Sequence, residues 1–261
     1  MGLFWFAVAL ILLYMTIPAL VVVATSFSPS ELLEFPPSGL SLKWYARAVT
    51  YPDFQDAFVN GLIVTSFAST LALMTGLAVA YLIDRYVFPG RTALEAVLSS
   101  PLIVPHFTTG LGFLLLGVGL GIGQSYAIVI VTHVLLVLPF VTRSVYVSLR
   151  NLDPHLERAA ANLGASPGRV LSRVTLPLLL PGMAGGWLVA AILSLTEFTA
   201  SLYVTAARTQ TLPVAMYTYI REYSDPTIAA VSAILILATT LVMFVANQYL
   251  GLGRILSIDA H

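Results

Sequence analysis

Six apolar runs, each long enough to cross a lipid bilayer, dominate this chain. A helix needs roughly 20 apolar residues to span a hydrocarbon core about 30 Å thick. Runs of this length fall at residues 3–24, 58–83, 96–120, 126–147, 178–204 and 228–250. They predict an all-α integral membrane protein in which six transmembrane helices form a single domain, residues 1–261. The first run lacks a basic segment before it and is longer than the apolar core of a cleaved signal peptide, so we expect it to remain as an anchor.

Composition excludes several other classes of protein. Hydrophobic residues make up 58% of the chain and charged residues 9%, whereas soluble domains carry about 25% charged residues. The formal net charge is zero, so no basic field is present to attract nucleic acid. Cysteine is absent and the four histidines lack the spacing of metal ligands, so the sequence predicts no metal site. No nucleophile, base and orienting group converge in the sequence, so we expect no catalytic residues and no enzyme activity.

The distribution of basic residues predicts the orientation of the spans, because loops on the cytoplasmic side are enriched in arginine and lysine. One side of the predicted topology holds eight basic residues (Arg85, Arg91, Arg143, Arg150, Arg158, Arg169, Arg173 and Arg254), and the other holds four (Lys43, Arg47, Arg208 and Arg221). We therefore expect both termini on the cytoplasmic side and the long polar loops, residues 25–57 and 206–227, on the outside.

A polar segment interrupts the apolar sequence between the fourth and fifth runs. Asp153 is a typical helix cap, and Pro154 suits the first helical position, where no N–H is needed. Gly164 suits the left-handed residue that ends a helix. The order of cap and proline recurs at Ser166 and Pro167. The segment therefore predicts a hairpin of two short helices at the cytoplasmic membrane surface.

The first helix of this hairpin has the form of a docking element. A narrow apolar stripe recurs at helical spacing, at Leu156, Ala159, Ala160 and Leu163. Arg169 and Arg173 are four residues apart in the second helix and so project together. These features fit insertion of the first helix into a groove of another protein; the alternative is a solvated loop held against the membrane by its arginines. Pro177 predicts a break before the fifth span.

The hairpin, residues 151–177, resembles the EAA loop of binding-protein-dependent ABC transporter permeases. The family pattern is Glu-Ala-Ala, three residues, Gly, nine residues, an aliphatic residue, one residue, then Leu-Pro. The matching positions are Ala159, Ala160, Gly164, Val174, Leu176 and Pro177, and the wider resemblance covers about residues 44–250. It implies that the loop enters a cleft of a cytoplasmic ATPase subunit and couples ATP binding to movement of the membrane helices.

The match departs from the family pattern at its glutamate. Arg158 occupies that position, and Glu157 precedes it by one residue. A shift of one residue rotates a helical side chain by about 100°, so Glu157 does not take the same place on the helix. Either the contact with the ATPase has changed, or a partner permease supplies the usual glutamate. We expect the coupling residues to include Glu157, Arg158 and Arg169 together with the matching positions.

The resemblance implies a transporter assembled from several chains. A P-loop of the form G-x-x-x-x-G-K-[ST] needs a lysine after glycine, and Lys43, the single lysine of this chain, lacks that context. We therefore expect no cofactor in this chain, with ATP and magnesium bound by a partner ATPase. The implied partners are a second permease subunit, two ATPase subunits and an extracytoplasmic solute-binding protein, in the lipid of a bacterial or archaeal cytoplasmic (inner) membrane.

One acidic residue lies inside a span. Glu197 is in the outer half of the fifth run, where a carboxylate facing lipid costs roughly 2.5–3.5 kcal/mol. Ser194 and Ser201 are three and four residues away, so a continuous helix would place all three side chains on one face. This spacing predicts a polar stripe along a translocation path. The alternative is a glutamate near the interface, hydrogen-bonded to a neighbouring span.

Two histidines also lie inside predicted spans. His106 follows Pro105, and His133 follows Thr132. A lone histidine in a membrane helix more often bonds to a neighbouring helix than relays protons. We expect such a bond at both positions.

The fifth run and the loop after it resemble the polyamine permeases. The similar stretch is SLTEFTASLYVTAARTQTLPVAMYTYI, residues 194–220. The resemblance implies a cationic substrate such as spermidine or putrescine, with Glu197 as a carboxylate in the path. Thr196 is neutral where the family has acidic character, so the match is partial. Related permeases move opines, aminoethylphosphonate or ferric iron, and these substrates stay open.

An ion-coupled secondary transporter is the more distant alternative. It predicts paired intramembrane charges, or broken helices in duplicated halves, whereas the sequence has one buried acid and no internal repeat. A channel or a membrane scaffold needs no cytoplasmic docking helix. The sequence therefore favours one permease subunit of an ABC importer that works by alternating access.

Overall fold

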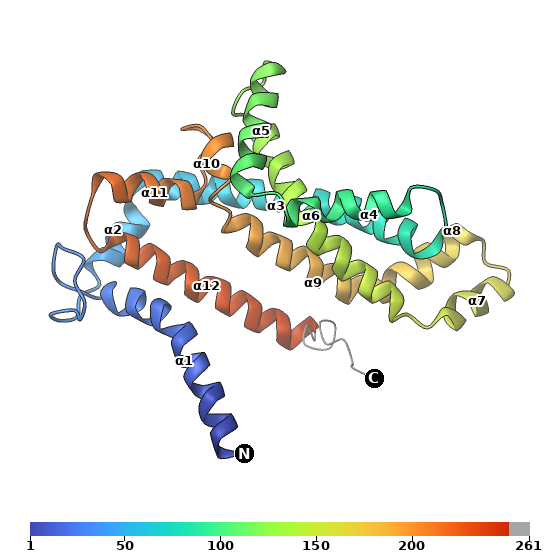
Figure 1. The fold of residues 1–261 in the computed structure, drawn as a ribbon, viewed down its shortest axis with the longest axis horizontal. Helices are drawn as coiled ribbons and strands as arrows, with labels where there is room; N and C mark the ends of the chain where they lie inside the picture. Colours follow the sequence, from blue (N-terminus) through green and yellow to red (C-terminus); the bar gives the residue numbers. More distant parts are fainter. Residues whose placement is uncertain (251–261) are drawn as a thin grey trace. The chain divides into compact units, whose positions relative to one another are not determined.

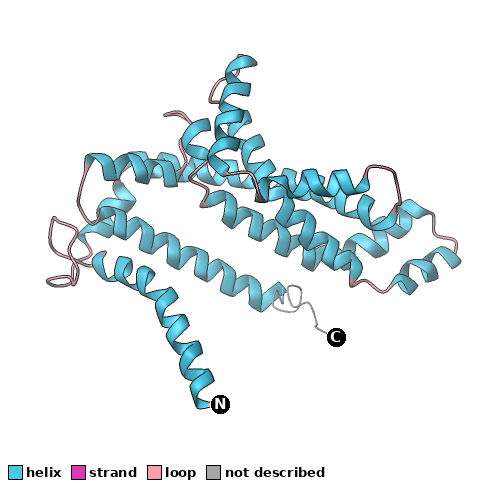
Figure 2. Ribbon diagram, viewed as in Figure 1, coloured by secondary structure: helices cyan, strands magenta, loops and turns pink. Residues whose placement is uncertain are grey.

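The computed structural model describes residues 1–250, with side chains as far as Gln248, and every regular element in this part of the chain is a helix (Figure 1, Figure 2). In chain order the elements are α1 (Gly2–Thr25), α2 (Lys43–Thr50), α3 (Pro52–Arg85), α4 (Arg91–Ser99), the 3₁₀ turn η1 (Ser100–Leu102), α5 (His106–Gly119), α6 (Tyr126–Arg150), α7 (Pro154–Asn162), α8 (Pro167–Val170), the π-helical turn η2 (Leu171–Thr175), α9 (Leu176–Leu195), α10 (Ser201–Val204), α11 (Leu212–Glu222) and α12 (Thr227–Leu250). Arg254, one of the basic residues used to predict orientation, lies outside the described residues.

Most of the predicted spans correspond to single long helices. The helical segments that are long and apolar enough to cross a membrane are Gly2–Thr25, Pro52–Arg85, Tyr126–Arg150, Pro167–Leu195 and Thr227–Gln248, and a bent pair, Arg91–Leu102 with His106–Gly119, makes a sixth when it is counted as one span. The predicted all-α membrane class is therefore confirmed.

The third pass is broken, not continuous as predicted for residues 96–120. α4 ends at Ser99, η1 follows, and α5 begins at His106 after a bend of 102° (Figure 1). Pro105 explains the break, because proline has no backbone N–H and disfavours helical backbone in the residue before it. An apolar run therefore gives the right number of residues without showing where the helix turns.

The fifth pass begins and ends earlier than the predicted range, residues 178–204. Helix continues through α8, η2 and α9, so the break predicted at Pro177 is absent. Pro177 lies in the first turn of α9 directly after η2, where the chain has already left the α-helical hydrogen-bond register. At the other end, α9 stops at Leu195 and α10 begins at Ser201. Glu197 therefore stands in a non-helical break.

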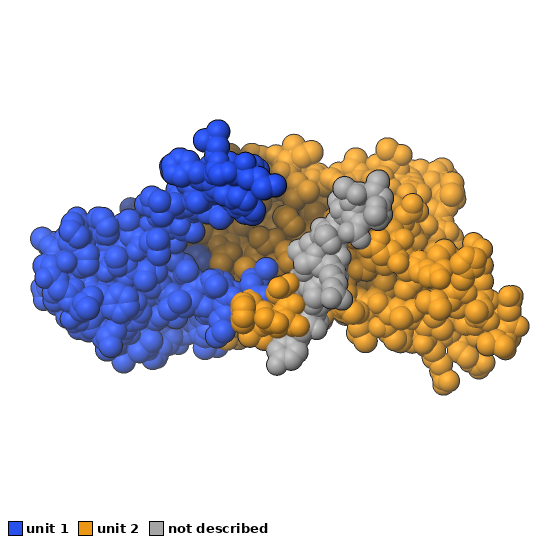
Figure 3. Space-filling view, turned by 90° about the horizontal axis from the view of Figure 1, so that it is seen from below, with its two compact units in different colours: residues 1–59, 212–243 blue, residues 60–211, 244–261 orange. Residues whose placement is uncertain are grey.

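The chain divides into two compact units, which Figure 3 colours separately. Unit 1 comprises Met1–Val59 and Leu212–Met243, and unit 2 comprises Asn60–Thr211 and Phe244–His261. The core of unit 1 is built from α2, the start of α3, α11 and the start of α12. Its buried side chains include Trp44, Phe54, Leu212 and Tyr219.

A buried carboxylate links three of the helices of unit 1. Asp225 accepts hydrogen bonds from Tyr219 Oη and from the Thr227 backbone N–H, both at 2.9 Å, and lies 3.4 Å from Nη1 of Arg47. Burial alone would raise the pKa of Asp225. The hydrogen bonds from Thr227 and Tyr219 and the charge of Arg47 outweigh burial, so the pKa lies below its ordinary value. The ionised group thus joins α2, α11 and α12.

In unit 2, small residues allow α6 and α9 to pack closely. A Cβ added at Gly182 would clash with Ser148 Oγ, and one added at Gly186 would lie 3.0 Å from Ser144 Cβ. Ser144 Oγ also donates to the Gly182 carbonyl at 3.0 Å. Small residues are typical of contacts between membrane helices, where packing must replace the hydrophobic driving force. This packing brings the end of α9, and the break that follows it, beside α6.

Candidate functional site

A buried imidazole bridges the break between α9 and α10. His133 of α6 is fully buried, with Nδ1 2.8 Å from Ser194 Oγ and Nε2 2.9 Å from Ser201 Oγ. Ser194 lies in the last turn of α9, and Ser201 begins α10. The two ring nitrogens therefore hold the two ends of the interrupted helix, as expected for a histidine that bonds to a neighbouring helix.

The hydroxyl groups around His133 set its tautomer. Ser201 Oγ donates its hydrogen to the Glu197 carbonyl at 2.9 Å, so it accepts from Nε2–H of His133. Nδ1 then accepts the hydroxyl hydrogen of Ser194, whose oxygen accepts in turn from Thr65 at 3.3 Å. One neutral tautomer satisfies every member of this chain of hydrogen bonds.

The carboxylate of Glu197 is held by two groups of the same chain. Oε1 accepts from the Ala200 backbone N–H at 2.8 Å, and Oε2 lies 2.8 Å from Nδ1 of His106, the first residue of α5. The side chain of Glu197 is 12% exposed and that of His106 is 44% exposed. The bond expected for His106 is therefore present, and its partner is Glu197.

The single helix face predicted for Ser194, Glu197 and Ser201 is wrong, because Glu197 stands in the break. The break nevertheless brings these residues together, with the serine hydroxyls directed to α6 and the carboxylate directed to α5. We call the connected polar side chains the break cluster. Its members are Thr65, His106, His133, Ser194, Glu197 and Ser201.

α5 approaches the break closely at a glycine. A Cβ added at Gly110 would lie 2.7 Å from the carbonyl oxygen of Ala200 and 2.8 Å from its Cα, and neither backbone atom can move aside as a side chain can. Gly110 is one turn after His106, so the same face of α5 carries the glycine and the imidazole. This backbone contact therefore places His106 against Glu197.

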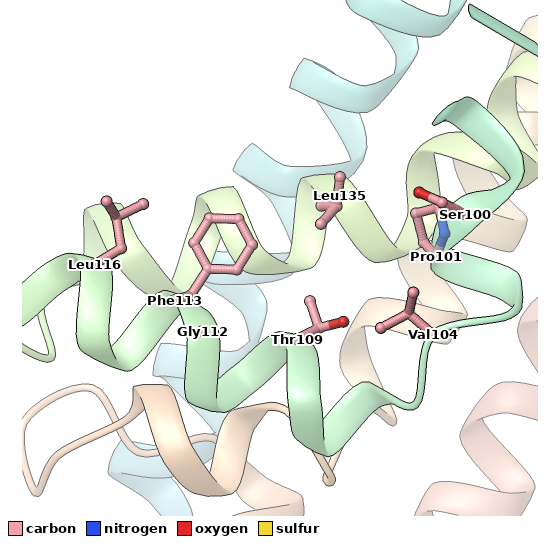
Figure 4. A pocket seen from close by; sticks show the side chains of 8 residues that line it. All are labelled: Ser100, Pro101, Val104, Thr109, Gly112, Phe113, Leu116 and Leu135. Carbon is pink, nitrogen blue, oxygen red and sulfur yellow. The ribbon is translucent and has the colours of Figure 1, made fainter. Parts of the chain in front are cut away.

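An apolar pocket lies along α5, next to its break from α4 (Figure 4). Its volume is about 280 Å³, and its lining residues are Ser100, Pro101, Val104, Thr109, Gly112, Phe113, Leu116 and Leu135. Two hydroxyl groups are the only polar side-chain groups in this lining. The pocket therefore offers apolar surface but no charged side chain that would fix an ionic solute.

The first short helix predicted for the hairpin is present as α7, whereas the second, α8, is continuous with the fifth pass. The Asp153 carboxylate accepts from the His155 backbone N–H at 2.9 Å and caps α7, and Gly164 follows the helix with φ +83°. Pro167 opens α8, although the side chain of Ser166 makes no capping bond. α8 then leads through η2 into the fifth pass.

Glu157 of the hairpin points into the chain. Its Oε2 lies 2.8 Å from Nη2 of Arg85 at the end of α3, and its Oε1 accepts from Thr175 Oγ1 in η2 at 2.7 Å. Both carboxylate oxygens are thus used to tie α7 to α3 and to the start of the fifth pass. Arg85 and Thr175 were not predicted as partners of Glu157, because spacing along the chain does not show which distant segments pack together.

The other residues of the hairpin motif face outward or are partly buried. Those exposed are Arg158, Ala159, Gly164, Arg169 and Pro177, and those partly buried are Ala160, Val174 and Leu176. The guanidinium groups of Arg158 and Arg169 make no ion pair with any residue between 1 and 250. Leu163 is 89% exposed. α7 thus presents an arginine and apolar side chains outward while its glutamate is turned inward.

A helical membrane protein with broken passes around a polar cluster, and with a polar hairpin that presents an outward helix face, has the form of a solute permease. Residues 72–252 match the family model described as "Binding-protein-dependent transport system inner membrane component", and the chain belongs to this family. It is a permease subunit of an ABC importer and a multi-pass protein of the inner membrane.

Two bacterial relatives and one solved structure illustrate the similarity. The chain is 29% identical over 239 residues to the spermidine/putrescine transport system permease protein PotC of Escherichia coli (strain K12), covering 91% of this chain and 89% of the relative. It is 30% identical over 236 residues to the putrescine transport system permease protein PotI of the same strain, covering 88% and 84%. The fold resembles a crystal structure of the bacterial alginate ABC transporter in complex with alginate pentasaccharide-bound periplasmic protein, with a TM-score of 0.72 at 14% identity over 94% of this chain and 93% of that chain.

Proposed function

We propose that this permease carries a polyamine, such as spermidine or putrescine, along a path that passes the break cluster. The observation that carries the proposal is the carboxylate of Glu197, which is held in the break between α9 and α10 with the imidazole of His106 beside it. The relatives named for spermidine and putrescine transport support the same class of substrate.

A polar cluster at a helix break suits a path that opens alternately to the two sides of the membrane. Non-helical backbone at membrane depth is tolerated where it is buried in protein or lines a cavity, and interrupted helices often bind solutes in transporters. An ionised group in this setting is costly unless it is paired. Glu197 gives the cluster a negative charge that an ammonium group matches, and Ser194 and Ser201 shape the path by fixing the break around His133.

The hairpin is proposed to couple this movement to ATP hydrolysis. α7 docks in a cleft of an ATPase subunit with its apolar side chains and Arg158, since Glu157 is already bound to Arg85. The complete importer contains a second permease, two ATPase subunits that bind ATP and magnesium, and an extracytoplasmic solute-binding protein. Both termini of this chain face the cytoplasm. A related fold solved with a periplasmic protein bound supports a partner of that kind.

The direct test is uptake by the complete importer in proteoliposomes. The chain is purified with the subunits that accompany it from native membranes, and ATP is supplied on the ATPase side. The binding protein and a radiolabelled solute are supplied on the other side. Spermidine and putrescine are compared with an opine, aminoethylphosphonate and ferric iron. We expect saturable, ATP-dependent uptake of a polyamine.

Two results would contradict the proposal. Uptake of one of the other solutes without polyamine uptake would assign the importer to a different substrate. Uptake driven by an ion gradient, in a preparation that contains no ATPase, would favour the secondary transporter.

A further inference from the structure

The break cluster leaves little of Glu197 for a solute to contact. One carboxylate oxygen accepts from the Ala200 N–H and the other faces Nδ1 of His106, each at 2.8 Å. The side chain is 12% exposed. An ammonium group that bound this carboxylate directly would have to displace the imidazole or crowd in beside it. The more accessible member of the pair is His106, at 44% exposed.

The pairing fixes which nitrogen of His106 is left to bind another group. An ionised carboxylate only accepts hydrogen bonds, so Nδ1 of His106 carries a hydrogen and donates it to Glu197. In the neutral ring, Nε2 then keeps its lone pair. Among residues 1–250, the hydrogen bond of the His106 ring is the one to Glu197, made by Nδ1. A carboxylate that holds one nitrogen in this way makes the other a better acceptor and fixes its direction.

The remaining members of the break cluster are already satisfied. Both ring nitrogens of His133 are bonded to serine hydroxyls, and the ring is fully buried. The Thr65 hydroxyl donates to Ser194. An exposed imidazole beside a carboxylate at membrane depth belongs to a water-filled path or a protein contact, not to a lipid-facing surface. His106 is therefore the member of the cluster that can meet a solute without breaking an existing bond.

We propose that Nε2 of His106 receives an ammonium N–H of the transported solute, and that Glu197 is a positioning residue that fixes the imidazole and supplies the charge. This assignment rests on the proposed function and specifies which atom meets the polyamine. With the imidazole neutral, the charge of the pair is the single negative charge of the carboxylate, which one ammonium group matches. An imidazole acceptor also selects for solutes that donate hydrogen bonds, so a quaternary ammonium of similar charge is a poor ligand.

The test separates the two nitrogens of the ring by substitution in the complete importer. In His106→Asn, the side-chain amide nitrogen replaces Nδ1 and still donates to Glu197, but no acceptor stands in the place of Nε2. In His106→Gln, an amide reaches the place of Nε2 and keeps an acceptor there. We expect the apparent KM for spermidine to rise about tenfold in the Asn variant, as when one hydrogen bond to a charged group is lost, and to stay within about threefold of wild type in the Gln variant.

The outcomes distinguish this inference from the proposed function. If wild type takes up spermidine and the Asn variant has the same KM, His106 does not contact the solute, although the polyamine importer stands. If wild type takes up no polyamine, both proposals fail. If the Asn variant does not assemble with its partners, the Gln variant tests the proposal by itself. A KM within about threefold of wild type supports the role of Nε2, and a tenfold rise contradicts it. Saturable uptake of a quaternary ammonium analogue with an unchanged KM would count against hydrogen bonding.

Discussion

The break cluster and the hairpin differ in whether their polar side chains are bonded within the chain. In the break cluster, both nitrogens of His133 and both oxygens of Glu197 are bonded within the chain. On the hairpin, the guanidinium groups of Arg158 and Arg169 form no ion pair with another described residue, and Leu163 is 89% exposed. The hydrogen bonds of the break cluster are thus largely made within the chain, whereas the hairpin presents side chains that another protein can contact.

Solvent explains this difference. A polar atom left unpaired in an apolar interior costs about 1–3 kcal/mol, so a cluster between membrane helices must satisfy its own members. An arginine at an aqueous surface carries no such penalty and is free to meet a partner. The comparison therefore predicts that substitutions at the buried, fully bonded members of the break cluster act through the chain itself, and that substitutions on the outward face of α7 act through its partners.

The largest effect is expected from Ala160→Trp on the hairpin. A bulky ring on the apolar stripe of α7 would block entry into the ATPase cleft, because the stripe is narrow only while it carries alanines. We expect the chain to insert and ATP hydrolysis to persist, while solute uptake falls at least about tenfold, the loss that corresponds to roughly 1.4 kcal/mol of coupling. Uptake and ATPase activity are measured in the same proteoliposomes.

His155→Trp is the matched control for this experiment. Position 155 is exposed on the same helix but lies about 140° around its axis from position 160. The added ring there should leave uptake near the wild-type rate. Normal uptake by the Ala160→Trp importer would show that this face of α7 does not dock.

Much of the fold follows from local features of the sequence. Apolar length predicts the long helices, and Asp153 and Gly164 mark the beginning and end of α7, because caps and left-handed residues act over a few positions. The break at Glu197 is different, since residues 194–201 read equally well as helix. It forms where His133 and Ala200 provide bonds that replace those of a continuous helix.

The candidate site was only partly predictable from the sequence, because its residues are brought together by tertiary packing. Glu197 can be identified from sequence as an acid inside a span, because charge at that depth is unusual. Its partner His106 comes from a different pass and depends on the bend at Pro105 and on the backbone contact at Gly110. The bond between Glu157 and Arg85 likewise joins segments whose pairing is decided by tertiary packing.

A smaller effect is expected from His133→Ala in the break cluster. The substitution removes two hydrogen bonds and leaves a cavity in a fully buried site, which together cost about 2–4 kcal/mol. The thermal midpoint of the purified chain should fall by roughly 5 °C or more, and it should fall without any partner present. An unchanged midpoint would mean that the break does not depend on this imidazole.

The smallest effects come from two neighbouring residues of α7, of which Glu157 is partly buried and Arg158 is exposed. Glu157→Gln weakens a partly buried ion pair to Arg85, worth about 1 kcal/mol. In the isolated chain, a broad-specificity protease should therefore cut the hairpin about fivefold faster. Arg158→Gln should leave the cutting rate of the isolated chain unchanged and instead weaken retention of the ATPase subunits during purification.

Protease cleavage and ATPase retention together distinguish the roles of Glu157 and Arg158. If Glu157 is an internal tie and Arg158 a docking contact, each substitution changes one assay and spares the other. Faster cleavage in Arg158→Gln, or loss of the ATPase in Glu157→Gln with normal cleavage, would reverse the assignment. In the second case, Glu157 would have to leave Arg85 when the importer assembles.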